Sequence, residues 1–168
     1  MTQTVHAIVR TDLMQGTIDG SSLVSLRYMG SGSTATKIDN GNVVVVEDLL
    51  DNERELYKGV TPTAGADFNK LVLVATPENM TDERKKNLNE FVNEAGADAR
   101  GYRLRHGNIF SVTAEALDGT PAKGNIVEAQ AGTKLKAVSA GTEDSTAIGK
   151  IIEVDVVGSD TFYVIRID

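Results

Sequence analysis

The sequence predicts an α+β fold that is mainly β, with short antiparallel strands, one prominent helix and a small carboxyl-terminal β-barrel or sandwich. Three observations lead to this prediction. Short runs of apolar and β-branched residues recur along the chain, and turn residues separate them. One segment, at about 81–95, has the period of an amphipathic helix. Finally, 16 glycines and no cysteine among 168 residues fit a turn-rich fold without disulfides.

The amino-terminal half contains three clear strand-like runs. Residues 5–10 form a short apolar run within the first forty residues, which are polar and glycine-rich between short strands and are expected to form an extended arm. Leu23–Tyr28 alternates apolar and polar side chains, which is typical of a half-buried strand. Residues 71–75 are apolar throughout and predict a strand that is buried on both faces.

A hairpin is predicted in the segment of the chain that lies between Leu23–Tyr28 and residues 71–75. Residues 34–38 and 43–47 are both rich in strand-forming residues, and Asn40-Gly41 lies between them. Asn-Gly favours a tight hairpin turn, because both residues tolerate a positive φ. We therefore expect the two runs to pair with each other.

The helix is predicted from about Thr81 to residue 95. Thr81 is a suitable N-cap, and Gly96 follows as a helix stop. One side of this helix is apolar at the spacing i, i+3, i+4 and i+7. We expect that side to be buried; it consists of Leu88, Phe91, Val92 and Ala95.

The carboxyl-terminal part returns to short strands. A terminal hairpin is predicted from residues 148–157 and 161–167, which flank Gly158-Ser159-Asp160. Regular spacing of short strands and turns is typical of a small barrel or sandwich. The predicted organisation is therefore a β-rich region with an arm and one helix over 1–100, and a barrel or sandwich over 101–168. The shorter strands expected in the second part are Ile109–Thr113, Ile126–Glu128 and residues 134–138.

Charge and composition argue against several function classes. The chain has 17 Lys+Arg and 24 Asp+Glu, a net charge of −7, which is unfavourable for a nucleic-acid partner. It has no apolar stretch near the roughly 20 residues that a membrane helix needs, so we expect no membrane partner. It also begins without the pattern of a secretory signal.

Catalytic and cofactor motifs are not expected either. Residues 30–35 fit a dinucleotide-binding pattern by letter, but that motif requires a helix to follow, and here a hairpin is predicted. The histidines, His6 and His106, lack the spacing of metal ligands. No nucleophile elbow is present. We therefore predict a protein that is not an enzyme and that needs no cofactor and no metal.

A resemblance gives a positive expectation. Residues 82–91 and 99–104 resemble small virion proteins of tailed bacteriophages that infect Firmicutes, encoded beside the major capsid protein. The segments 107–113, 131–135 and 162–165 are similar to the β-rich module of capsid decoration, or cement, proteins. The resemblance implies a structural protein that bridges major capsid protein subunits on the capsid exterior, with possible self-association on the lattice. It also implies a location on the virion, and in the host cytoplasm during assembly.

Two segments are candidates for the capsid interface. The arm, with Val5, Ile8 and Arg10, is placed to add a strand to a neighbour, although it could instead complete the core sheet. Arg103 and Arg105 lie on one face of a predicted strand and suit an acidic partner surface. Two other function classes stay open. One is another phage structural role, as a head–tail connector or tail-tube protein. The other is a small-molecule-binding or hydrolytic protein, which would have a closed pocket lined by converging polar groups.

Overall fold

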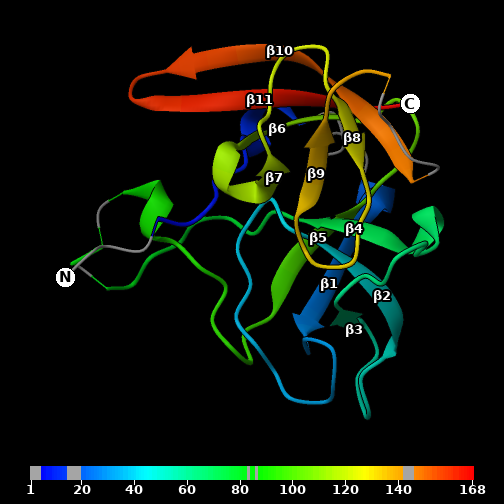
Figure 1. Cartoon of the computed structure of the whole chain (residues 1–168). Coiled ribbons are helices and arrows are strands. Elements are labelled where there is room, and N and C mark those ends of the chain that lie inside the picture. Colours follow the sequence, from blue (N-terminus) through cyan, green and yellow to red (C-terminus); the bar gives the residue numbers. More distant parts are fainter. Residues whose placement is uncertain (1–4, 15–19, 83, 86, 142–145) are drawn as a thin grey trace.

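The structure, a computed structural model, consists of two β-sheets and describes residues 5–14, 20–82, 84–85, 87–141 and 146–168 (Figure 1). The prediction of a mainly β fold is confirmed. The first sheet closes into a barrel with the strand order β1-β3-β2-β4-β5. Its strands are β1 (Leu23–Tyr28), β2 (Val43–Leu49), β3 (Leu56–Val60), β4 (Leu71–Val74) and β5 (Ala99–Arg103).

The second sheet has six strands in the order β6-β11-β10-β8-β9-β7. The barrel therefore lies in the amino-terminal part, and the carboxyl-terminal barrel or sandwich predicted from the sequence is wrong. Even spacing of short strands does not reveal whether a sheet closes, because closure depends on which edges pair. These strands are β6 (Ile109–Thr113), β7 (Leu117–Gly119), β8 (Ile126–Glu128), β9 (Leu135–Val138), β10 (Ala147–Val157) and β11 (Asp160–Ile167).

β4 shows how the two sheets share side chains. Val72 and Val74 point into the barrel and pack with Leu26, whereas Leu71 and Leu73 pack in a second cluster that contains side chains of both sheets. Successive residues of a strand point to opposite faces, so a strand covered on both faces is apolar throughout. This explains the uninterrupted apolar run, and the predicted buried strand is confirmed.

The two sheets are joined by one core. The buried cluster between them contains Tyr102 from the barrel and Phe110, Ile151 and Ile165 from the second sheet. β5 extends across the expected division of the chain at residue 100, because it runs from Ala99 to Arg103. The segments on either side of that division therefore contribute to the same barrel.

The helix predicted for about 81–95 is wrong. Across the described residues the structure contains no α-helix, and the described part of 81–95 has no helical residues apart from one turn of 3-10 helix, η5 (Leu88–Glu90). Leu88 is 51% exposed, although Val92 is buried as expected. Asparagine is a poor helix former because its side chain competes for backbone hydrogen bonds. The segment contains three such residues, and these are Asn87, Asn89 and Asn93.

The hairpin predicted for residues 34–47 is wrong as well. A turn does form at Asn40-Gly41, and Gly41 has a φ of 82°. However, Ile38 forms a bridge with Asn93, and β2 pairs with β3 and β4. The turn forms where Asn-Gly predicts it, but the residues on either side of the turn pair with distant segments and not with each other.

The remaining short helical turns connect strands and cover the sheet ends. Their bounds are η1 (Thr11–Leu13), η3 (Gly20–Ser22), η4 (Phe68–Lys70) and η6 (Ala114–Ala116). The terminal hairpin is confirmed: β10 and β11 pair from Gly149↔Ile167 to Val157↔Asp160. In Figure 1 this hairpin is the long orange-to-red ribbon that extends beyond the other strands of its sheet.

Candidate interaction surface

The arm lies along the edge of β6. Arg10 N donates to Ser111 O at 3.0 Å, and Thr113 N donates to Ile8 O at 3.1 Å. Ile8 is buried, whereas Val5 is 51% exposed. Residues 8–10 therefore extend the second sheet of their own chain, and of the two predicted apolar contact residues only Val5 lies on the free surface.

Arg10 is engaged within its own chain. Its guanidinium forms an ion pair with Asp12, with Nη2 at 2.8 Å from Oδ2, and lies 5.7 Å from the centre of the Phe162 ring. The hydrogen bonds that the guanidinium donates to the Asp12 carboxylate raise the pKa of Arg10 above its ordinary value. Phe162 is buried although it points away from the shared core, and the Arg10 side chain over the ring contributes to shielding it from water.

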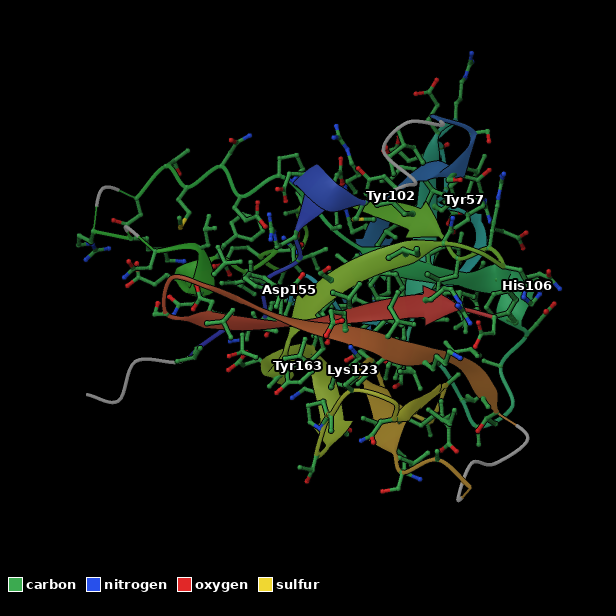
Figure 2. The ribbon with its side chains drawn as sticks, turned by 90° about the horizontal axis from the view of Figure 1, so that it is seen from above. Tyr57, Tyr102, His106, Lys123, Asp155 and Tyr163 are labelled. Carbon is green, nitrogen blue, oxygen red and sulfur yellow. The ribbon has the colours of Figure 1, made fainter. Side chains whose placement is uncertain are left out.

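The two predicted arginines of the barrel lie in a different region. Arg103 is partly buried and lies 5.5 Å from the centre of the Tyr57 ring. Arg105 is exposed, and its Nη2 lies 3.4 Å from Ser21 O. Figure 2 shows Tyr57 well separated from Asp155, a residue of the β10–β11 hairpin whose charge acts on Arg10. The structure therefore does not bring the arm and these arginines into one surface.

Exposed aliphatic side chains occur at the start of the arm, on η5 and on both faces of the outer part of the β10–β11 hairpin. We call these positions together the tip surface, and they are Val5, Leu88, Val156 and Val157. His6 N donates to Asn89 O at 2.8 Å, which keeps the start of the arm beside η5. A hollow of about 460 Å³ separates η5 from the hairpin turn; it is lined by Ile8, Asn87, Leu88, Asn89, Ser159 and Asp160.

The hairpin carries different chemistry on its two faces. Val154 and Val156 point to one face, and Glu153, Asp155 and Val157 point to the other, as strand alternation requires. Val156 is 72% exposed, the highest value among the exposed large apolar side chains that the structure describes. One face of the outer hairpin is therefore apolar, and the other carries two acidic side chains together with Val157.

Glu153 marks the inner end of this exposed part. Its carboxylate accepts a hydrogen bond from Lys123 Nζ at 2.6 Å and another from Val154 N at 3.1 Å. These two bonds, the one from Lys123 first, lower the pKa of Glu153 below its ordinary value. The carboxylate is therefore held over a backbone N–H group of β10.

A second hollow lies where the two sheets meet, near the end of β11. It has a volume of about 460 Å³, and its lining includes Phe68, Asn69, His106, Ile148 and Asp168. The His106 ring lies 4.9 Å from the Phe68 ring, and its Nδ1 is hydrogen-bonded to the main-chain oxygen of Asp168. The lining is mixed in polarity, and His106 and Asp168 are its titratable residues within the described part of the chain.

The structure adds no grouping of metal ligands within the part of the chain that it describes. There, no set of three or more histidine, aspartate or glutamate side chains is arranged to hold a metal ion. Across the same residues, no helix has the length and apolar character needed to cross a membrane.

Sequence reasoning missed most of the tip surface. It predicted the terminal hairpin but placed both of its strands within a small barrel or sandwich. The available signal was length: residues 148–157 are predicted as one strand, whereas the neighbouring runs are about half as long. A strand that is longer than the strands beside it can extend past them, and the part that extends is then a sheet edge.

Comparisons of the chain with protein-family models, with curated proteins and with solved structures found no match.

Proposed function

We propose that the protein decorates the exterior of a tailed-phage capsid and stabilises it by bridging subunits of the major capsid protein. The observation that carries the proposal is the tip surface, which exposes aliphatic side chains on a hairpin that projects from its sheet (Figure 1). Exposed apolar side chains that gather at one place are typical of protein–protein contact sites. The resemblance of residues 82–91 and 99–104 to phage virion proteins names the kind of partner.

The physical properties of the chain support this role. Two sheets with a shared core hold the hairpin and the arm in fixed positions relative to each other. A net charge of −7 favours solubility of many copies before they bind. Because a decoration protein contacts more than one subunit, its second contact is effectively intramolecular, and it binds the assembled lattice better than free subunits.

Co-sedimentation with capsids tests the proposal. Shells are assembled from the major capsid protein whose gene the resemblance predicts beside the gene of this chain. They are mixed with the purified protein and sedimented. We expect copies bound over the whole shell, little binding to unassembled subunits, and a higher disassembly temperature of the decorated shells. The variant Val156→Asp is expected to bind more weakly, whereas Val60→Thr on the barrel serves as a control.

Other outcomes would replace the proposal. Binding confined to one vertex of the shell would indicate a head–tail connector. Rings formed by the protein alone would indicate a tail-tube protein. No co-sedimentation under any condition would remove the decoration role.

A further inference from the structure

We infer that the outer part of β10 is a docking edge for an extended segment of another protein, in which apolar and basic residues alternate. The segment would join the sheet as an additional strand beside Val154–Val157. This inference rests on the proposed function for the existence of a partner. It deepens that function by naming the contacting edge and the chemistry of the segment that fits it.

The first step is that β10 extends beyond the end of its neighbouring strand β8. β8 pairs with β10 only from Ala147 to Lys150, and two further bonds connect Ile151 with Gly124 N and Asn125 O, both at 2.8 Å. From Glu153 to Val157, the pairing that the structure describes is with β11 alone. One side of this stretch is therefore an open sheet edge.

The second step is the direction of the backbone groups. Val157 pairs with Asp160 across the two-residue turn Gly158-Ser159, so these two residues exchange backbone hydrogen bonds. Such pairs alternate along a hairpin with pairs that do not exchange bonds. The N–H and C=O groups of Val154 and Val156 therefore point to the open edge. The bond from Val154 N to its neighbour's carboxylate, Glu153 Oε1, agrees with this direction.

The third step concerns edge protection, which the chain provides at the bulge, at Glu153 and at Asp155, but not at Val156 and Val157. Natural sheets protect an edge with a bulge, a charged side chain or a proline. β10 has a bulge between Ile151 and Glu153, and Glu153 covers the N–H of Val154. Beyond that point come Asp155, Val156 and Val157, and no described residue pairs with their open side. An exposed β-branched edge of this kind is a template for another strand.

The fourth step excludes a second copy of this chain as the favoured occupant. Antiparallel pairing of two such edges must join Val154 and Val156 of one copy to those of the other. The central register then places Asp155 opposite Asp155 of the second copy, and a register shifted toward Glu153 places Glu153 opposite Asp155. A register shifted toward the turn avoids these contacts but pairs only residues 155–157 of each copy, because the turn begins at Gly158. Like charges directly opposite each other destabilise a strand pair. Two chains of net charge −7 also repel each other.

The same charges define the occupant. Glu153 already accepts a hydrogen bond from Lys123, so Asp155 is the acid that a basic side chain of the segment pairs with on this face, and apolar side chains on the other face pack beside Val156. Alternation with a period of two places each kind on its own face. The fitting segment is therefore a strand in which valine-like and lysine-like residues alternate.

Peptide binding to the full-length protein tests the inference. The probe is a short synthetic peptide of alternating valine and lysine, and the control peptide alternates valine and glutamate. We expect the valine–lysine peptide to shift the amide resonance of Val156 and to slow its hydrogen exchange, and the control peptide to do neither. The exchange of amides in β4, inside the shared core, should not change.

Three variants sharpen the test. Val156→Pro removes an N–H that points to the open edge without removing a bond to β11, and it should weaken peptide binding by about tenfold or more. Val156→Thr keeps that N–H and should bind like the wild type. Asp155→Lys should weaken binding of the valine–lysine peptide and strengthen binding of the valine–glutamate peptide. This variant therefore tests the edge even if the proline variant folds poorly.

The outcomes separate this inference from the proposed function. Equal binding of both peptides, or unchanged binding by both Val156→Pro and Asp155→Lys, would overturn the inference. Protection of Val156 that rises with protein concentration alone would overturn it in favour of a second copy. If Val156→Pro loses the peptide but binds shells as well as wild type, the edge is not the capsid contact, and the proposed function stands. If the wild type binds the peptide but no shells, the proposed function fails.

Discussion

Asn40 is a side chain on which the packing of two long loops depends. It is fully buried, and its Oδ1 accepts hydrogen bonds from Thr76 N at 3.0 Å and from Asn93 Nδ2 at 3.1 Å. Its Nδ2 donates to Thr76 O at 2.8 Å. These bonds hold the segment around Ile38 against the extended segment that ends at Asn93, which is why neither forms the local structure that its sequence favours.

Replacing this side chain should destabilise the fold. Asn40→Ala removes the hydrogen bonds that Asn40 makes with the half-buried main chain of Thr76 and with Nδ2 of the buried Asn93, and each unsatisfied group costs about 1–3 kcal/mol. We expect the free energy of unfolding to fall by about 2–4 kcal/mol, measured by urea denaturation followed by circular dichroism. The exposed Asn79→Ala variant should stay within about 0.5 kcal/mol of wild type. Equal stability of the two variants would show that the buried network contributes little.

Glu153 and Lys123 give a prediction on pH. The bond from Lys123 lowers the pKa of Glu153, so Glu153 stays ionised to a lower pH than an ordinary glutamate. A carboxylate with a lowered pKa in the folded state stabilises the fold above its ordinary pKa, and the effect disappears as the pH falls through the lowered value.

We expect Lys123→Ala to raise the pKa of Glu153 toward the ordinary value, as measured by a carboxyl-carbon NMR titration. Asp82 is the internal control, because its pKa is lowered to about 2 by hydrogen bonds from Arg84 and not by Lys123. A pKa of Glu153 that does not change in the variant would mean that the backbone N–H of Val154 alone holds the carboxylate.

At the scale of elements, the sequence predicts those strands for which the apolar pattern and the flanking turn residues indicate the same bounds. β1, β6 and β8 have the predicted bounds, and the β10–β11 hairpin forms around its predicted turn. The helix at 81–95 fails because its apolar spacing is matched by only a few residues, and hydrogen bonds of Asn93 with Ile38 favour an extended chain. Local periodicity carries no information about such distant partners.

The interior of the barrel leaves no room for a side chain at one position of β5. A Cβ at Gly101 would collide with Val72 Cγ1 and lie 2.9 Å from Leu26 Cδ2. We expect Gly101→Ala to lower the free energy of unfolding by about 1–3 kcal/mol, because an overpacked core forces its neighbours to shift. Gly32→Ala, where a Cβ would have open space around it, should change stability little in the same thermal or urea unfolding experiment. A wild-type melting temperature for Gly101→Ala would mean that the barrel accommodates the extra methyl group.

At the scale of the whole molecule, the β10–β11 hairpin separates two surface features of the structure. The hollow beside His106 lies where β11 ends, and the tip surface lies at the opposite end of the β10–β11 hairpin (Figure 2). The sequence indicated the arm as a contact segment, and the structure places Val5 of that arm near the hairpin tip through the bond from His6 to Asn89. Charge pattern alone suggested Arg103, which contacts Tyr57 of its own chain. A sequence does not reveal which charged residues are used internally, because that depends on the packing of distant strands.

The copy number of this protein in purified virions tests the decoration role most directly. The measurement is quantitative mass spectrometry of intact particles, with the major capsid protein as the internal reference. Decoration of the shell requires a ratio of the two proteins that is constant between preparations and comparable with the number of lattice positions. Absence of the protein from washed particles, or a ratio that corresponds to a single ring at one vertex, would contradict the proposed role.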